Sequence, residues 1–525
     1  MAKIPQRKFI TKILQNPFLP YPKLDENFTG RDTLIAGVIT ALSLETKEPT
    51  HHPIRFPFVC LHGLEGHGKT KAAQKIASVC IEDKIFTDIV WVSADNPAGV
   101  EDKIRNELDR LRCKGFEEVE GILLANKFYD LLKLMNLRKF LLIFDNIVGY
   151  NELEKYFPLN RDVKNIAVLA TSIEKIIVPA AVGIIDNFKV NIFEESEAFK
   201  VASKILQGDD EKHEISLLIT ESGRIPLLLC MMSATISSFR IFQKMLNLES
   251  YPYTIHQYLQ EMKGKSENPV DNLNLYPFNT KLNTCVKIAR DKLRESCSLY
   301  TPITLHLLER CVYFGTDFPF NYLRKHVTTI KTDIQDILDQ PFDPYTYPIE
   351  LFKNAIRLLA RFLLLDIKPT TSPNRYIFGI DVKVHSLIGG ALRSLQVEEN
   401  QEHDILEDLI GCKDYPESEF NDGDRVQFSD EASVHSKSVA TLWSHAAKYE
   451  DLTRLVAFTL MSPSYTYVNE YSMSKFLTCH ENSDSCDPSY QKKSILRYYN
   501  FNMEHQTENI LFERNSSWKR DPLEQ

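Results

Sequence analysis

Residues 63–70 read Gly-Leu-Glu-Gly-His-Gly-Lys-Thr and satisfy the phosphate-loop pattern G-x-x-x-x-G-K-[ST]. The apolar run at 56–61 suits a buried strand, and residues 70–80 carry apolar side chains at helical spacing. A strand, a glycine-rich loop and a helix in this order place backbone N–H groups around an anion, next to the positive end of the helix dipole. The alternative is a glycine-rich turn with a chance lysine.

The loop supplies most of the predicted nucleotide-binding residues. We expect Lys69 to reach the β- and γ-phosphates and Thr70 to offer its hydroxyl to Mg²⁺. The full predicted set in this segment is Gly63, Gly66, His67, Gly68, Lys69, Thr70 and Lys71.

Downstream of the loop the chain alternates between strand and helix patterns, which predicts a parallel α/β sheet. Strands are expected at 85–92, 139–146 and 166–172, and helices at 100–111 and 121–135.

Two of these strands end in polar residues. The strand at 139–146 ends in Asp145, at the edge of a parallel sheet where ligands bind. We expect Asp145 to organise Mg²⁺ and to form the catalytic pair with Lys69. Capping of the following turn is the alternative. Thr171, at the end of the strand 166–172, can sense the γ-phosphate or simply be a β-branched strand residue.

Composition sets the class of protein. The 525 residues are enough for roughly three or four domains. Apolar residues make up 43% and charged residues 25%, as in ordinary soluble proteins. The net charge of −9 argues against a nucleic-acid-binding surface. No secretory signal or membrane-spanning run is visible, so we expect a cytoplasmic protein with no membrane partner.

Cysteine usage fits the same compartment. The ten cysteines are scattered without a C-x-x-C pair, which indicates neither a zinc module nor a disulfide framework. Cys479 and Cys486 can pair or bind a metal, and unpaired surface thiols are the alternative.

Four further segments, taken with the phosphate loop and in this order, resemble a known family. They are Phe28-Thr29-Gly30-Arg31-Asp32, Asp88-Ile89-Val90-Trp91-Val92-Ser93, Gly223-Arg224-Ile225-Pro226-Leu227 and Val384-His385-Ser386-Leu387. The series resembles the NB-ARC family of STAND P-loop NTPases, which includes the apoptotic protease-activating factor and plant disease-resistance receptors. The resemblance covers roughly residues 25–395.

The resemblance implies three further nucleotide contacts. Arg31 is expected near the adenine, Pro226 is expected to pack on the nucleotide, and His385 is expected to contact the β-phosphate of ADP. The residues alone allow simpler interpretations. Arg31 can be a solvated charge, Gly223 and Pro226 can stop and restart a helix, and His385 can be a core or capping residue.

Two departures from the family pattern concern hydrolysis. Asn146 follows Asp145 where many members carry a second acid, and an asparagine cannot act as a base toward water. Thr171-Ser172-Ile173 lacks the arginine that many members place after the threonine, which removes a charge-assisted contact of about 1.5–3 kcal/mol to the γ-phosphate. We therefore expect slow hydrolysis.

The predicted fold class is α/β: a P-loop NTPase parallel sheet followed by a small helical domain, a winged-helix domain and a C-terminal helical region. The expected borders are 1–25 for an N-terminal lead-in, 26–195 for the nucleotide-binding domain, 196–264 for the helical domain, 265–295 for a linker, 296–396 for the winged-helix-like domain, 397–463 for a helical region that can begin a repeat array, and 464–525 for a polar, partly mobile tail. We expect no effector domain within the 25-residue lead-in, and the sequence can be one piece of a longer receptor.

The expected function is an ADP/ATP-binding molecular switch in signalling, such as apoptosis or innate immunity. Slow ATP hydrolysis and nucleotide exchange would control domain opening and self-association. Expected partners are the nucleotide with Mg²⁺, other protein chains and further copies of this chain. The alternatives are a constitutive P-loop ATPase and a helical interaction scaffold with a decayed nucleotide site.

Overall fold

The computed structural model describes residues 28–43, 56–95, 97–110, 113, 119–135, 137–158, 165–177, 185–207, 210–245, 252–265, 277–296, 301–313, 317–319, 349–369, 380–411, 445 and 448–449. The chain divides into two compact units, 1–292 with 361–363 and 370–373, and 293–360 with 364–369 and 374–525. The predictions for 1–25 and 464–525, including Cys479 and Cys486, lie outside the described residues, as does most of 412–463.

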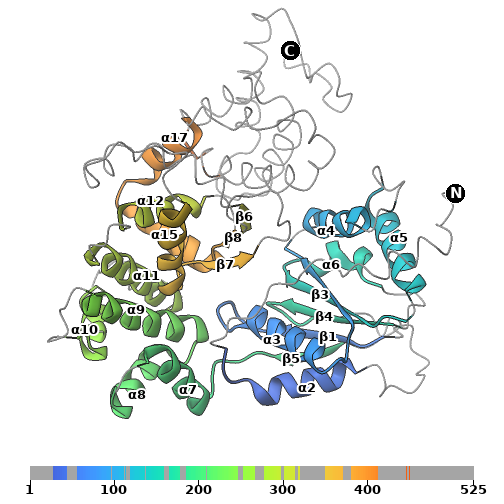
Figure 1. Ribbon diagram of the computed structural model, residues 1–525, viewed down its shortest axis with the longest axis horizontal. Helices are drawn as coiled ribbons and strands as arrows, with labels where there is room; N and C mark the ends of the chain where they lie inside the picture. The colour runs from blue at the N-terminus through green and yellow to red at the C-terminus, as the bar shows by residue number, and fades with distance from the viewer. Residues whose placement is uncertain are drawn as a thin grey trace, which may run out of the picture. The chain divides into compact units, whose positions relative to one another are not determined.

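The first unit is built on a five-stranded sheet in the order β2-β3-β4-β1-β5, in which all neighbouring strands are parallel (Figure 1). Its strands are β1 Phe58–His62, β2 Asp88–Ser93, β3 Phe140–Ile147, β4 Ile166–Ser172 and β5 Asp186–Lys189. The predicted parallel α/β sheet is confirmed. Because β4 lies between β1 and β3, the carboxyl ends of these three strands are adjacent, and His62 is paired with Ser172.

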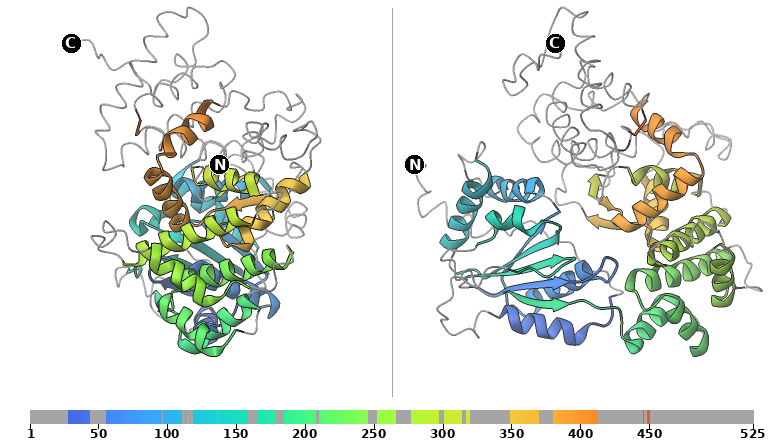
Figure 2. Two further views of the ribbon diagram at one scale, coloured as in Figure 1. Left: turned by 90° about the vertical axis from the view of Figure 1, so that its left-hand side faces the viewer. Right: turned by 180° about the vertical axis from the view of Figure 1, so that it is seen from behind.

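Helices cover both faces of this sheet, as the opposite views show (Figures 1 and 2). One face packs against α2 Asp32–Leu42 and α3 Lys69–Glu82. The other packs against α4 Pro97–Arg110, α5 Gly121–Leu134 and α6 Tyr150–Leu153, which continues into the 3₁₀ turn η1 Glu154–Tyr156. Every residue of β1 and β4 is buried, which explains why both read as continuous apolar runs with no alternation.

The rest of the first unit is helical. Its elements are α7 Glu195–Leu206, α8 Lys212–Glu221, α9 Pro226–Met245, α10 Ile255–Lys265 and α11 Pro277–Glu295, whose last residues pass into the second unit. The prediction of a linker at 265–295 is wrong for 277–295, which form a helix. The polar composition of α11 hid buried residues at helical spacing, namely Leu282, Cys285, Val286, Ala289 and Leu293.

The second unit contains α12 Thr301–Cys311, β6 Asp317–Pro319, α15 Ile349–Arg361, β7 Asp366–Pro369, β8 Ile380–Lys383, α16 Ser386–Glu398 and α17 Glu402–Gly411. Its three strands form an antiparallel sheet in the order β6-β8-β7. Helices beside a small sheet occupy 296–396, where a winged helix is predicted, and that assignment stays a prediction. Across the described residues, no helix has both the length and the apolar character to cross a membrane.

Candidate functional site

The phosphate loop connects the end of β1 to the start of α3 through glycines in unusual backbone conformations. Gly66 and Gly68 have φ of 76° and 87°, in the left-handed region that favours glycine. A Cβ at Gly68 would meet no atom within 4 Å, so the loop has open space on this side. The N–H of Gly63 donates to the carbonyl oxygens of Ser172 and Ile173, at 3.3 and 3.1 Å. These bonds fasten the start of the loop to the end of β4.

Lys69 lies at the first position of α3, and its ammonium donates to the loop carbonyl oxygens of Gly63 at 2.7 Å and Leu64 at 3.0 Å. Burial lowers the pKa of Lys69, and the carboxylates of Glu65 and Asp145 oppose this shift. The ammonium therefore lies over the loop, in the electrostatic range of Asp145.

Three side chains from three adjacent elements meet at the carboxyl edge of the sheet. Asp145 is buried at 4% exposure, and its Oδ1 accepts from the Thr70 hydroxyl at 2.8 Å and the Thr171 hydroxyl at 2.7 Å. Thr171 in turn accepts from the N–H of Asn146 at 2.8 Å. The structure thus brings together Lys69, Thr70, Asp145 and Thr171, which sequence reasoning placed at one site.

This donor set fits a divalent cation. Mg²⁺ prefers oxygen ligands and usually takes one or two protein oxygens together with water and phosphate oxygens. The carboxylate of Asp145 and the hydroxyl of Thr70 supply such oxygens, and the 2.8 Å between them shows that one ion can reach both. Thr70 and Asp145 are therefore the residues that would hold Mg²⁺ beside a bound nucleotide.

Arg31 is half-buried just before α2, so the interpretation as a solvated surface charge is wrong. Its guanidinium donates to three backbone carbonyl oxygens, those of Asn191, Ile192 and His67, and stacks over the Phe193 ring at 4.7 Å. Burial lowers the pKa of Arg31, and Glu197 opposes this shift most strongly. In this structure Arg31 contacts the phosphate loop itself.

The loop is also held by His67 and by the start of α9. Nδ1 of His67 lies 3.0 Å from the carbonyl oxygen of Val190. Pro226 is buried at the first position of α9, and the N–H of Leu227 donates to the carbonyl oxygen of Gly66 at 3.1 Å. The segment 223–227 therefore restarts a helix, as its residues alone indicate, and also lies against the phosphate loop.

Two predicted residues remain. Lys71 is half-buried in the first turn of α3, next to Thr70. His385 belongs to the second unit, where it caps α16: its Nδ1 accepts from the N–H of Leu387 at 3.2 Å. The capping interpretation of His385 is therefore correct locally, and its predicted phosphate contact stays a prediction.

Sequence reasoning missed Glu197, whose Oε1 accepts from the N–H of Arg31 at 2.6 Å across 166 positions of sequence. Glu194 and Glu197 form the capping box of α7, and the acid-x-x-acid spacing before a helix was the available signal. That spacing indicates a helix start, but it does not reveal a contact with Arg31.

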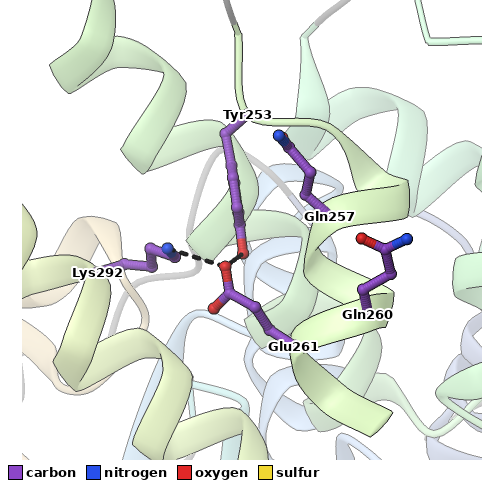
Figure 3. Close-up of a pocket in the computed structure, with 5 residues that line it drawn as sticks. All are labelled: Tyr253, Gln257, Gln260, Glu261 and Lys292. Atoms are coloured by element: carbon purple, nitrogen blue, oxygen red, sulfur yellow. Dashed lines mark hydrogen bonds and ion pairs between the residues drawn. The ribbon is translucent and has the colours of Figure 1, made fainter. Parts of the chain in front are cut away.

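A pocket of about 440 Å³ lies away from the phosphate loop and is lined by Tyr253, Gln257, Gln260, Glu261 and Lys292 (Figure 3). Its charges are already paired, because the Lys292 ammonium lies 2.9 Å from Glu261 and the Tyr253 hydroxyl donates to the same oxygen at 2.9 Å. The ammonium also lies over the Tyr253 ring at 4.7 Å. Because these polar side chains of the pocket already contact one another, we interpret the pocket as part of the packing between α10 and α11.

One other group in the described part of the chain has donors suited to a metal. His403, Asp404 and Glu407 of α17 place their ligand atoms within 4.8 Å of one another. Both acids are exposed, and such groups are common on helices without an ion, so we assign them no role.

Comparison with known proteins gives a family match for the segment that carries the phosphate loop. Residues 33–211 match the family model of the NB-ARC domain. No curated protein matches the chain. Among solved structures, Cdc6p from Pyrobaculum aerophilum is 14% identical with a TM-score of 0.29, and the match covers 74% of this chain and 98% of that one. The Aeropyrum pernix ORC2 protein, solved as ADPNP and ADP complexes, is 12% identical with a TM-score of 0.32, and the match covers the same shares, 74% and 98%.

Proposed function

We propose that this chain, whose residues 33–211 match the family model of the NB-ARC domain, is an ADP/ATP-gated molecular switch. One observation supports nucleotide and Mg²⁺ binding more than any other. Asp145 accepts hydrogen bonds from both Thr70 and Thr171 beside the loop that carries Lys69. Thr70 and Asp145 would hold the cation, which would neutralise phosphate charge, and Lys69 would contact the phosphates from the loop.

The proposal includes slow hydrolysis. Asn146 has an exposed side chain, but its amide cannot accept a proton from an attacking water. Its backbone has φ of 68°, and its N–H is bonded to Thr171, so the residue serves to shape the site. Nucleotide state would then persist long enough to act as a signal.

The proposal also includes a sensor in the second unit. Because Nδ1 of His385 accepts a backbone N–H, the neutral imidazole carries its proton on Nε2, where it is a donor suited to a phosphate oxygen. We propose that ADP bound to the loop, Pro226 and His385 favours a closed arrangement, and that ATP favours an open one that self-associates with other copies of this chain. A ligand can shift this equilibrium only by binding the two arrangements differently.

Light scattering tests the switch. The purified protein is sized with ADP and Mg²⁺, then with a non-hydrolysable ATP analogue and Mg²⁺. We expect a monomer with ADP and a larger species with the analogue. In the His385→Ala variant we expect weaker ADP binding and partial association even with ADP.

Three results would contradict the switch. Equal mass in both nucleotides would remove the proposed coupling between nucleotide and association. Steady turnover above about 1 s⁻¹ would favour a constitutive ATPase, because that rate lies in the ordinary enzyme range. A folded protein that binds neither nucleotide would favour the scaffold alternative.

A further inference from the structure

The carboxylate of Glu197 lies at the centre of a network that links α7 to the phosphate loop. It is half-buried in the first turn of α7. Its Oε1 accepts from the N–H of Arg31 at 2.6 Å, and its Oε2 accepts from the N–H of Glu194 at 3.1 Å. One side chain therefore holds the start of α7 and the residue that precedes α2.

Arg31 needs this support for its backbone. Gly30 and Arg31 have φ of 84° and 67°, so two successive residues are left-handed. That conformation is natural for glycine and unfavourable for a residue with a Cβ. A short hydrogen bond from the N–H of Arg31 to a carboxylate is of the strong, charge-assisted kind, and it stabilises the turn.

The guanidinium of Arg31 needs the same carboxylate for its charge. It lies 3.9 Å from Oε2 of Glu197, while the three carbonyl oxygens to which it donates, those of His67, Asn191 and Ile192, are neutral. A half-buried cation is costly without a nearby anion. Loss of the carboxylate would therefore disturb the position of the guanidinium as well as the backbone of Arg31.

Arg31 in turn acts on the phosphate loop. Its Nη2 donates to the carbonyl oxygen of His67 at 3.4 Å, one residue along from Gly66, whose carbonyl accepts from Leu227. Carbonyl oxygens held from outside the loop fix the direction of the loop peptide groups, and an anion-binding nest depends on the direction of its N–H groups.

We propose that Glu197 is a positioning residue for nucleotide binding: through Arg31, it fixes the phosphate loop from the first turn of α7. This inference rests on the proposed nucleotide-binding function. It makes the loop sensitive to the placement of α7, since a shift of that helix would release Arg31 and change the anion-binding geometry.

The test compares three acids within four residues. Glu197→Ala removes both contacts, Glu194→Ala removes a capping bond of α7, and Glu195→Ala changes an exposed acid of the same turn. Each full-length variant is titrated with a fluorescent ADP analogue, and hydrogen exchange is followed at residues 64–70. We expect roughly tenfold weaker ADP binding and faster loop exchange for Glu197→Ala alone, with the other two variants within about twofold of wild type.

Two further variants separate positioning from folding. Arg31→Ala should weaken ADP binding as Glu197→Ala does, and the double variant should lose little more, because both changes break one chain of contacts. Glu197→Gln keeps an acceptor oxygen and should lie between wild type and Glu197→Ala. It serves in place of the alanine variant if that protein does not fold.

The outcomes separate the two proposals. Wild-type ADP affinity in Glu197→Ala would overturn the positioning role and leave nucleotide binding intact. An equal loss in Glu194→Ala would show that ADP binding depends on the acids at the start of α7 in general, and would overturn a specific positioning role of Glu197. Absence of ADP binding in folded wild-type protein would overturn the proposed function, and this inference with it.

Discussion

At the scale of single residues, the site depends on backbone conformations that side-chain patterns do not reveal. Asn146 has φ of 68°, and asparagine tolerates this region better than most residues with a Cβ. The turn directs its N–H to Thr171, which donates to Asp145. The sequence shows only that Asn146 cannot act as a base toward water. The structure shows that its backbone also positions Thr171 beside the carboxylate of Asp145.

The sequence predicts the residues that carry the chemistry of the site better than it predicts the contacts that hold the phosphate loop in place. Lys69, Thr70, Asp145 and Thr171 were placed by motif and by strand ends, and the structure brings them together. The contact between Arg31 and Glu197 joins residues 166 positions apart, and no local pattern encodes such a pair.

His67 gives a prediction about pH. Burial lowers its pKa, and Lys69, Arg31 and Lys189 lower it further, while the hydrogen bond with Val190 opposes the shift. The unfolded state therefore binds more protons at this group than the folded state does as the pH falls below about 6.5. The free energy of unfolding should fall as pH drops from 6.5 towards the folded pKa, by at most about 1.4 kcal/mol per pH unit from this group.

Denaturant unfolding between pH 7.5 and 5 measures this slope. His67→Asn should flatten it, because the variant has no imidazole at this position. A slope that is the same in wild type and in His67→Asn would show that folding does not lower the pKa of His67.

At the scale of elements, strongly apolar segments were predicted best. The strand at Ile166–Ser172 has the predicted ends, because all seven of its residues are buried and the segment is apolar until its last two positions. The edge strand β5, Asp-Asn-Phe-Lys, was missed because it is short and polar. Helix α11 was missed because charged residues cover its exposed face, which resembles a linker in composition.

The junction between β1 and the phosphate loop gives a prediction about stability. Gly63 has φ of 152°, and a Cβ there would lie 2.5 Å from the backbone oxygen of Val190, which cannot move aside as a flexible side chain could. Gly63→Ala should lower the free energy of unfolding by about 2 kcal/mol. Thermal or denaturant unfolding measures the change.

A second glycine provides the control. Gly264 lies in α10, and a Cβ there meets nothing within 4 Å. Gly264→Ala should raise the free energy of unfolding by up to about 0.5–1 kcal/mol, because alanine loses less backbone entropy in a helix. The two substitutions are predicted to change the free energy of unfolding in opposite directions, which a general sensitivity to mutation cannot produce. A Gly63→Ala protein as stable as wild type would refute the close approach to Val190.

At the scale of the whole molecule, the chain joins a parallel sheet that carries the phosphate loop, with its helices, to a second unit that holds His385. The sequence predicts the order of these parts, since each has its own motif or periodicity. It does not predict their packing, which depends on contacts between distant residues. The proposed switch depends on nucleotide binding at the phosphate loop, so nucleotide binding is the central claim.

The most direct test is the nucleotide content of purified protein, measured by mass spectrometry after denaturation and followed by titration with ADP. We predict bound ADP in wild-type protein and in Lys75→Ala, which removes a lysine of the same helix α3 that lies outside the loop. Lys69→Ala should fold but retain no nucleotide, because the ammonium over the loop is lost. Folded wild-type protein without ADP affinity, or Lys69→Ala that retains ADP as well as wild type does, would contradict the account.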